Sequence, residues 1–161
     1  MKILLAVDES AFSDAAIQMV SRQFRPDSAE VRVFHSVEWI NALPMSFRFG
    51  EGPTYDKDVV SLRDTAFQEG EQLVARAAER LQAAGFRTAT TIADGDPRHT
   101  ILDCATEWQP DLIVMGSHGR RNLDRFLLGS VSETVMRHAA CSVEIVRVLS
   151  STASQNPAGR G

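Results

Sequence analysis

The chain has 161 residues, of which 43% are hydrophobic and 24% charged, and its formal net charge is -4. This length and apolar content predict a single domain with a sizeable core. The acidic balance argues against binding of nucleic acid through a broad basic face. The first apolar run, residues 2–7, is too short for a signal peptide or a membrane span, so we expect a cytoplasmic protein without membrane attachment.

Cysteines and histidines match no metal-binding pattern. Cys104 and Cys141 lack the spacing of a metal or redox motif, and we expect two buried thiols in a reducing compartment. The four histidines form no His-x-x-x-His pair and no cluster with the cysteines. We therefore expect no structural transition metal.

Strand-like and helix-like patterns alternate along the chain. Short apolar or β-branched runs predict strands at residues 2–7, 30–37, 88–92, 112–115 and 142–148. Apolar residues at helical spacing predict helices at about 13–24, 56–84, 97–109 and from 130 onward. This order predicts an α/β fold, with a single open, doubly wound, five-stranded parallel sheet and helices on both faces.

Local signals predict several helix ends. Ser13 or Asp14 is predicted to cap the first helix, and Gly85 to end the long second helix. Asp96 followed by Pro97 is a strong start signal for the third helix, because Asp is a good cap and Pro suits the first helical position.

Two segments lack a regular pattern. Residues 38–54 combine prolines and glycines with large apolar side chains, and they could fold over the sheet edge, line a pocket or meet a partner. A partly buried loop is the simplest interpretation of them. Residues 150–161 are polar and predict a disordered tail, so the predicted nucleotide-binding domain is 1–149.

One loop carries the clearest chemical signal. The fourth apolar run ends at Gly116, Gly119 and Gly129 follow, and a helical pattern begins at Ser130. Ser130 and Glu133 have the spacing of a capping box, in which each side chain bonds a free backbone N–H. The N-terminus of a helix suits an anion, and glycine lets the backbone approach phosphate oxygens. The spacing matches neither a P-loop nor Gly-x-Gly-x-x-Gly.

These residues carry a family resemblance. The segment GSHGRRNLDRFLLGS, residues 116–130, resembles the ATP-binding signature of the universal stress protein family, in which two glycines are followed after nine residues by Gly-Ser. The order of elements and the Asp-x-Ser after the first strand match too, so the resemblance covers about residues 2–148. It implies a Rossmann-like fold of the adenine nucleotide α-hydrolase type and ATP as ligand, with Mg²⁺ or Mn²⁺ at the phosphates.

The resemblance also implies a homodimer through the last strand, 142–148. The residues of this strand are mostly apolar, and an apolar strand at a sheet edge exposes unpaired backbone groups that invite another chain. The expected partners are thus an adenine nucleotide and a second copy of the chain, and no nucleic acid.

Ligands of open α/β sheets bind beyond the carboxyl ends of the strands, at the switch point. The apolar residues at the ends of the first and fourth strands could pack against adenine: Ala6, Val7 and Met115. The resemblance implies backbone contacts with adenine at Ser36 and Val37. It implies contacts with ribose and phosphates at Gly116, Gly119, Gly129, Ser130, Val131 and Ser132. Between the glycines, Arg120 adds positive charge and His118 is a further candidate for contact with phosphate.

Spacing alone leaves several roles open for Asp8, which directly follows the first strand. It could accept a hydrogen bond from a ribose hydroxyl or bind a metal ion near the phosphates. It could instead cap backbone N–H groups of the following helix. The resemblance implies contact with the nucleotide.

The sequence favours an ATP-binding module over an enzyme. Phosphoryl transfer needs a residue that orients the attacking group, and none stands out. We expect a nucleotide-dependent signalling or stress-response module with at most slow ATP hydrolysis. One alternative is an ATP-consuming enzyme, adenylating or hydrolysing, on the same fold, although residues 8–11 lack the glycines that such a loop would need. The other is a dimeric scaffold without nucleotide turnover.

Overall fold

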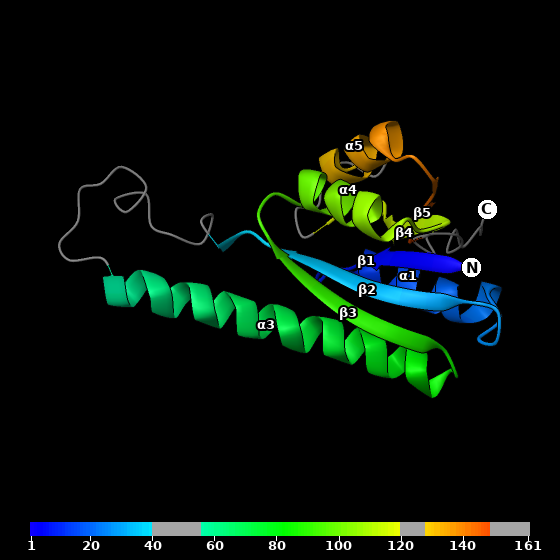
Figure 1. Cartoon of the computed structure of the whole chain (residues 1–161), viewed down its shortest axis with the longest axis horizontal. Helices are drawn as coiled ribbons and strands as arrows, with labels where there is room; N and C mark the ends of the chain where they lie inside the picture. Colours follow the sequence, from blue (N-terminus) through cyan, green and yellow to red (C-terminus); the bar gives the residue numbers. More distant parts are fainter. Residues whose placement is uncertain (40–55, 120–127, 149–161) are drawn as a thin grey trace, which may run out of the picture.

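The computed structural model describes residues 1–39, 56–119 and 128–148, and it confirms the expected α/β fold (Figure 1). Strands and helices alternate in the order β1 (Lys2–Ala6), α1 (Ala11–Gln23), β2 (Glu30–Val37), α3 (Asp56–Ala83), β3 (Arg87–Asp94), α4 (Pro97–Trp108), β4 (Leu112–Gly116), α5 (Ser130–His138) and β5 (Ser142–Val146). The expectations for Arg120, for most of the loop at 38–54 and for the tail at 150–161 lie outside the described residues.

The five strands form one parallel sheet with the order β3-β2-β1-β4-β5. The chain extends the sheet from β1 through β2 to β3, and then places β4 on the other side of β1. The switch point therefore lies between β1 and β4, where Ala6 is the register partner of Met115. β5 lies at an edge of the sheet, as the sequence predicts.

Helices cover both faces of the sheet and create two apolar cores (Figure 1). α1 and α3 cover one face, where Leu5 of β1 packs in the same cluster as Leu81 of α3. α4 and α5 cover the other face, where Ala6 of β1 belongs to the cluster of Val135. Because successive side chains of a strand point to opposite faces, burial on both faces explains why the central strands are continuous apolar runs.

Two predicted helix signals are confirmed. Asp96 is the N-cap of α4 and accepts a hydrogen bond from the Arg98 N–H at 2.9 Å, with Pro97 in the first turn. After α3, Gly85 adopts a φ of 92°, and the N–H groups that follow the helix bond back to carbonyls of its last turn. This is the geometry for which glycine is favoured after a helix.

The predicted cap of α1 is wrong. The cap is Ser10, whose hydroxyl oxygen accepts a hydrogen bond from the Ser13 N–H at 3.2 Å, rather than Ser13 or Asp14. Several residues of this stretch are good caps by type, and the helix starts one turn earlier than the apolar pattern suggests.

The predicted capping box at α5 is also wrong. The N-cap is Gly129, and no side chain in the described part of the chain caps this end of the helix. Glu133 does not reach back toward Ser130, because its carboxylate pairs with Arg137 one turn later at 2.9 Å. Such an i,i+4 pair competes for the carboxylate on an exposed helix face.

Within the described residues, no helix is long and apolar enough to cross a membrane. Cys104 is buried and Cys141 is half-buried, and both are free thiols. Burial raises the pKa of both thiols, which keeps them protonated and poorly reactive at neutral pH.

Candidate functional site

The switch point brings together the two strand ends that the sequence singles out. Asp8 follows β1 closely, and the turn from Gly116 to Gly119 follows β4. The two segments are close, since a Cβ on Gly119 would lie 2.8 Å from Oδ2 of Asp8. Residues far apart in the chain thus form one surface at the carboxyl edge of the sheet, where ligands of this fold class bind.

The start of α1 holds the Asp8 carboxylate. Its Oδ1 accepts hydrogen bonds from the Ser13 hydroxyl at 2.7 Å, from the Ser10 N–H at 3.1 Å and from the Ser10 hydroxyl. The Asp8 N–H donates to the Ser13 hydroxyl oxygen at 2.8 Å. Three donors use Oδ1 fully, whereas Oδ2 faces Gly119. Asp8 therefore bonds a backbone N–H beside α1 and still presents one oxygen to the loop.

The turn after β4 is tied to both neighbouring elements. The Ser117 N–H donates to the C=O of Val146 at 2.8 Å. The Ser117 C=O accepts from the Gly129 N–H at 2.8 Å and from the buried Ser132 hydroxyl at 2.9 Å. These bonds hold the N-terminus of α5 against the end of β4. They also commit the Ser132 hydroxyl to a protein carbonyl, which leaves its backbone N–H for the predicted ligand contact.

Among the described residues, no side chain caps the N-terminus of α5. The first backbone bond of the helix runs from the Glu133 N–H to the Gly129 C=O at 2.9 Å. The preceding N–H groups, those of Ser130, Val131 and Ser132, belong to the helical turn that has no acceptor within its own helix. Ser130 is exposed and Val131 is half-buried against the core of α4 and α5. Free N–H groups and the positive end of the dipole suit an anion such as phosphate.

Packing inside the protein explains two of the three signature glycines. A Cβ on Gly116 would lie 2.6 Å from Cβ of Phe12, and a Cβ on Gly129 would lie 3.1 Å from the carbonyl oxygen of Ser117. Neither glycine has a positive φ, so small size rather than backbone freedom is what these positions require. The predicted reason, close approach of phosphate, is therefore not needed to explain glycine at these two positions.

His118 lies inside the turn and is almost completely buried. Its ring packs against the ring of Phe12 at 5.3 Å between centroids, and its Nδ1 lies 3.1 Å from the Ser117 hydroxyl. Its Nε2 is buried without a hydrogen-bond partner in the described structure. The contact with Phe12 directs the imidazole toward α1.

The predicted adenine contacts fall on both faces of the sheet. Ala6 and Met115 pack in the core of α4 and α5, whereas Val7 packs in the core of α1 and α3. The Ser36 hydroxyl donates to the Gly95 C=O at 2.6 Å, and the C=O of Val37 accepts from the N–H of the same glycine at 3.2 Å. An adenine ring that contacts the side chains of Ala6 and Met115 would thus lie on the α4 and α5 side.

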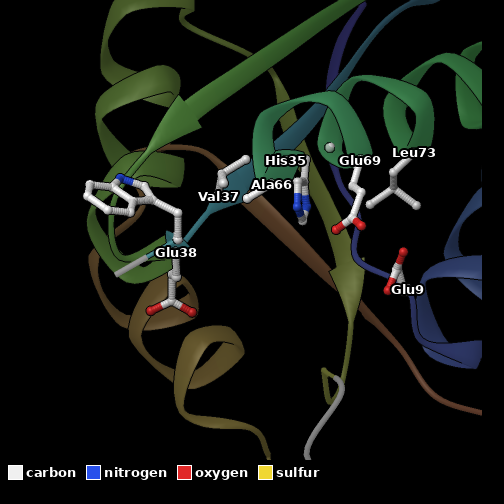
Figure 2. Close-up of a pocket in the computed structure, with 9 residues that line it drawn as sticks. Glu9, His35, Val37, Glu38, Ala66, Glu69 and Leu73 are labelled. Carbon is white, nitrogen blue, oxygen red and sulfur yellow. The ribbon is translucent and has the colours of Figure 1, made fainter. Parts of the chain in front are cut away.

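A small cavity lies between β2 and α3, and Glu38 and Trp39, the described start of the segment that could line a pocket, belong to its lining. It has a volume of about 130 Å³ and is lined by Glu9, His35, Val37, Glu38, Trp39, Ala66, Glu69, Gly70 and Leu73. Figure 2 shows the side chains of His35, Glu69 and Glu9 close together, from β2, α3 and the turn after β1. This volume is below the roughly 300–1,000 Å³ of most ligand pockets. No motif links these positions, which come from three distant parts of the sequence.

A divalent metal ion at this site would depend on the nucleotide. The described residues contain no group of three or more His, Cys, Asp or Glu side chains that could hold a metal. Mg²⁺ is usually bound by one or two carboxylates together with substrate phosphates and water. The single Asp8 oxygen that faces the loop therefore fits a metal shared with phosphates, and does not form a metal site alone.

Comparison with known sequences identifies one family. Residues 1–147 match the universal stress protein family. Among curated proteins, the universal stress protein YxiE of Bacillus subtilis is 32% identical over 146 residues, covering 91% of this chain and 98% of YxiE. Among solved structures, MJ0577 of Methanocaldococcus jannaschii is similar with a TM-score of 0.78 and 27% identity, covering 93% of this chain and 97% of that chain.

Two similar structures contain adenine nucleotides. The universal stress protein of Archaeoglobus fulgidus in complex with dAMP has a TM-score of 0.59 and 24% identity, covering 91% of this chain and 97% of its own. A universal stress protein family member of Arabidopsis thaliana with AMP bound has a TM-score of 0.64 and 20% identity, covering 99% of both chains. At these identities the similarity shows a common fold.

Proposed function

Since the chain belongs to the universal stress protein family, we propose that it binds an adenine nucleotide at the carboxyl ends of β1 and β4. The observation that carries this proposal is that a carboxylate oxygen of Asp8 faces Gly119 in the turn after β4, at the switch point of the sheet, and that the same turn holds the N-terminus of α5, where the N-cap Gly129 has no side chain. The nucleotides in the two similar structures support the same ligand class.

The ligand we propose is ATP, together with Mg²⁺ or Mn²⁺. The N–H groups at the start of α5 would bind phosphate oxygens, helped by the positive end of the helix dipole. Oδ2 of Asp8 would accept a hydrogen bond from a ribose hydroxyl or bind the metal ion. A bound metal would neutralise phosphate charge. Arg120 would add positive charge beside the phosphates.

Binding, rather than turnover, is the role that the site supports. Three hydrogen bonds fix Oδ1 of Asp8, so the carboxylate is held in one orientation with Oδ2 toward the turn after β4, as a ligand-binding group requires. We propose a cytoplasmic module whose nucleotide occupancy serves in signalling or the stress response, with at most slow ATP hydrolysis. If the protein is instead an ATP-consuming enzyme, a measurement of ATP turnover will show it.

The test starts with the wild-type protein. Mass spectrometry of small molecules released from the purified protein should detect an adenine nucleotide, and calorimetry with ATP, ADP and AMP, each with and without Mg²⁺, should show saturable binding. Chromatography of an ATP incubation then measures turnover. Absence of binding for all three nucleotides at millimolar concentration would contradict the proposal, and rapid multiple turnover would favour the enzyme.

Asp8→Asn separates the two ligand roles of the carboxylate. The amide keeps the shape of the side chain but removes its charge. If Oδ2 binds the metal, the variant should lose about tenfold or more in affinity with Mg²⁺ and little in EDTA. If it accepts a ribose hydroxyl, the loss should be similar under both conditions. Wild-type affinity under both conditions would show that Asp8 does not contact the ligand and serves only to bond the groups at the start of α1.

We also propose a homodimer through β5. The C=O of Val146 accepts from the Ser117 N–H, so Val146 faces β4. Because the N–H and C=O of a strand residue point to the same side, the backbone of Ile145 faces the open edge. Ile145→Pro should remove an outward donor and shift a wild-type dimer toward monomer in sedimentation velocity. A wild type that is monomeric at high concentration, with and without ATP, would refute the dimer.

A further inference from the structure

One buried hydroxyl holds both the backbone and the side chain of Asp8. Ser13, in the first turn of α1, is only 4% exposed. Its Oγ donates to Oδ1 of Asp8 at 2.7 Å and accepts from the Asp8 N–H at 2.8 Å. The helix cap is Ser10, so the Ser13 hydroxyl is not used to cap α1.

This bonding decides which carboxylate oxygen faces the loop after β4. Oδ1 is turned toward the start of α1, and Oδ2 toward Gly119. The last torsion of an Asp side chain has a broad energy minimum, so the orientation has to come from its hydrogen bonds. Removal of the Ser13 hydroxyl would leave Oδ1 with the two donors of Ser10 and would free the Asp8 N–H.

We propose that Ser13 is a positioning residue of the nucleotide site, whose hydroxyl orients Asp8 so that Oδ2 is presented to the ligand. The inference rests on the proposed function, because it assigns a residue to that same site. Ser13 is buried, so it acts through Asp8 and not by contact with the nucleotide.

The experiment is a double-mutant cycle measured by calorimetry with Mg²⁺ and ATP. It compares the wild type with Ser13→Ala, Asp8→Ala and the double variant. Ser21→Ala is the matched control, because it removes a hydroxyl from the same helix that, within the described residues, donates to the Ile17 C=O at 3.0 Å and bonds no other group. Coupling between two residues appears as a departure from additivity.

Ser13→Ala should weaken ATP binding about tenfold, as expected for loss of a hydrogen bond to a charged group. Ser21→Ala should bind like the wild type. In the Asp8→Ala background, Ser13→Ala should change affinity by less than about twofold, because its effect passes through the missing carboxylate. A merely structural role of Ser13 would give the same loss in both backgrounds.

The positioning role would be overturned if Ser13→Ala bound ATP like the wild type, or if it lost the same affinity in both backgrounds. Should Ser13→Ala not fold, Ser13→Cys fills nearly the same volume with a weaker hydrogen-bonding group and takes its place in the cycle. If the wild type itself binds no adenine nucleotide, the proposed function fails. If the wild type binds and Ser13→Ala binds equally well, only the positioning role fails.

Discussion

The N-termini of α1 and α5 lie at the same edge of the sheet but differ in how they are capped. At α1, the Ser10 side chain caps the helix, and the Asp8 carboxylate bonds groups of the same turn. At α5, the cap is Gly129, which has no side chain to offer. N–H groups that are already bonded are not available to an anion. The N-terminus of α1, which we call the closed terminus, has a side-chain cap and holds a carboxylate. The N-terminus of α5, which we call the open terminus, begins at Gly129 and offers N–H donors to a ligand.

The largest effect is expected at Gly119, in the turn after β4 that faces the Asp8 carboxylate. Gly119→Ala would place a Cβ 2.8 Å from Oδ2 of Asp8, whose other oxygen is fixed by three hydrogen bonds. We expect affinity for ATP with Mg²⁺ to fall about 100-fold, because the carboxylate must turn away from the ligand. Calorimetry measures the affinity, and thermal unfolding checks that the variant is folded. A folded variant with wild-type affinity would show that Oδ2 does not face the ligand.

A smaller effect is expected from adding charge to the open terminus. Ser130→Glu changes an exposed residue, and an acidic side chain in a first helical turn should stabilise the protein by about 0.3–1 kcal/mol. The same charge should repel phosphate and weaken ATP binding about tenfold, with a smaller loss for AMP. Ser28→Glu, at an exposed residue between α1 and β2, is the matched control. Equal affinity of both variants would place the phosphates away from α5.

The smallest effect on binding is expected at a second closed terminus, that of α4. Asp96→Ala removes the cap that accepts from the Arg98 N–H, and we expect a loss of about 0.5–2 kcal/mol in the free energy of unfolding. ATP affinity should not change, since this helix terminus does not belong to the proposed site. Urea unfolding and calorimetry measure the two quantities. A loss of ATP affinity would mean that the site extends to α4.

The same cap predicts a pH dependence. The hydrogen bond from the Arg98 side chain is the main reason why the pKa of Asp96 lies below its ordinary value. A carboxyl with a lowered folded-state pKa stabilises the protein fully above its unfolded pKa of about 3.9, and this stabilisation is lost as pH falls through the folded-state pKa. The difference in stability between wild type and Asp96→Ala should therefore shrink as the pH falls below about 4. A difference in unfolding free energy that stays independent of pH down to about 2 would show that the ionised Asp96 carboxylate does not contribute it.

Local sequence chemistry determined most of the fold. The alternation of apolar runs and helical patterns predicted all five strands and a parallel sheet, because strands that are buried on both faces are continuous apolar runs in the sequence. Asp96 and Gly85 were predictable for the same reason, since a cap or a positive φ involves only residues a few positions apart. The glycine pattern likewise predicted the loop between β4 and α5, which is where we propose the site.

Tertiary structure alone decided how the site is built. Ser13 has the sequence signal of a cap, but it bonds Asp8 because β1 delivers that carboxylate to the start of α1. Gly119 faces Asp8 because β1 and β4 are neighbours in the sheet, although the two residues lie more than 100 positions apart in the chain. The contact between Gly119 and Asp8 depends on which strands become neighbours, and periodicity along the chain carries no information about it.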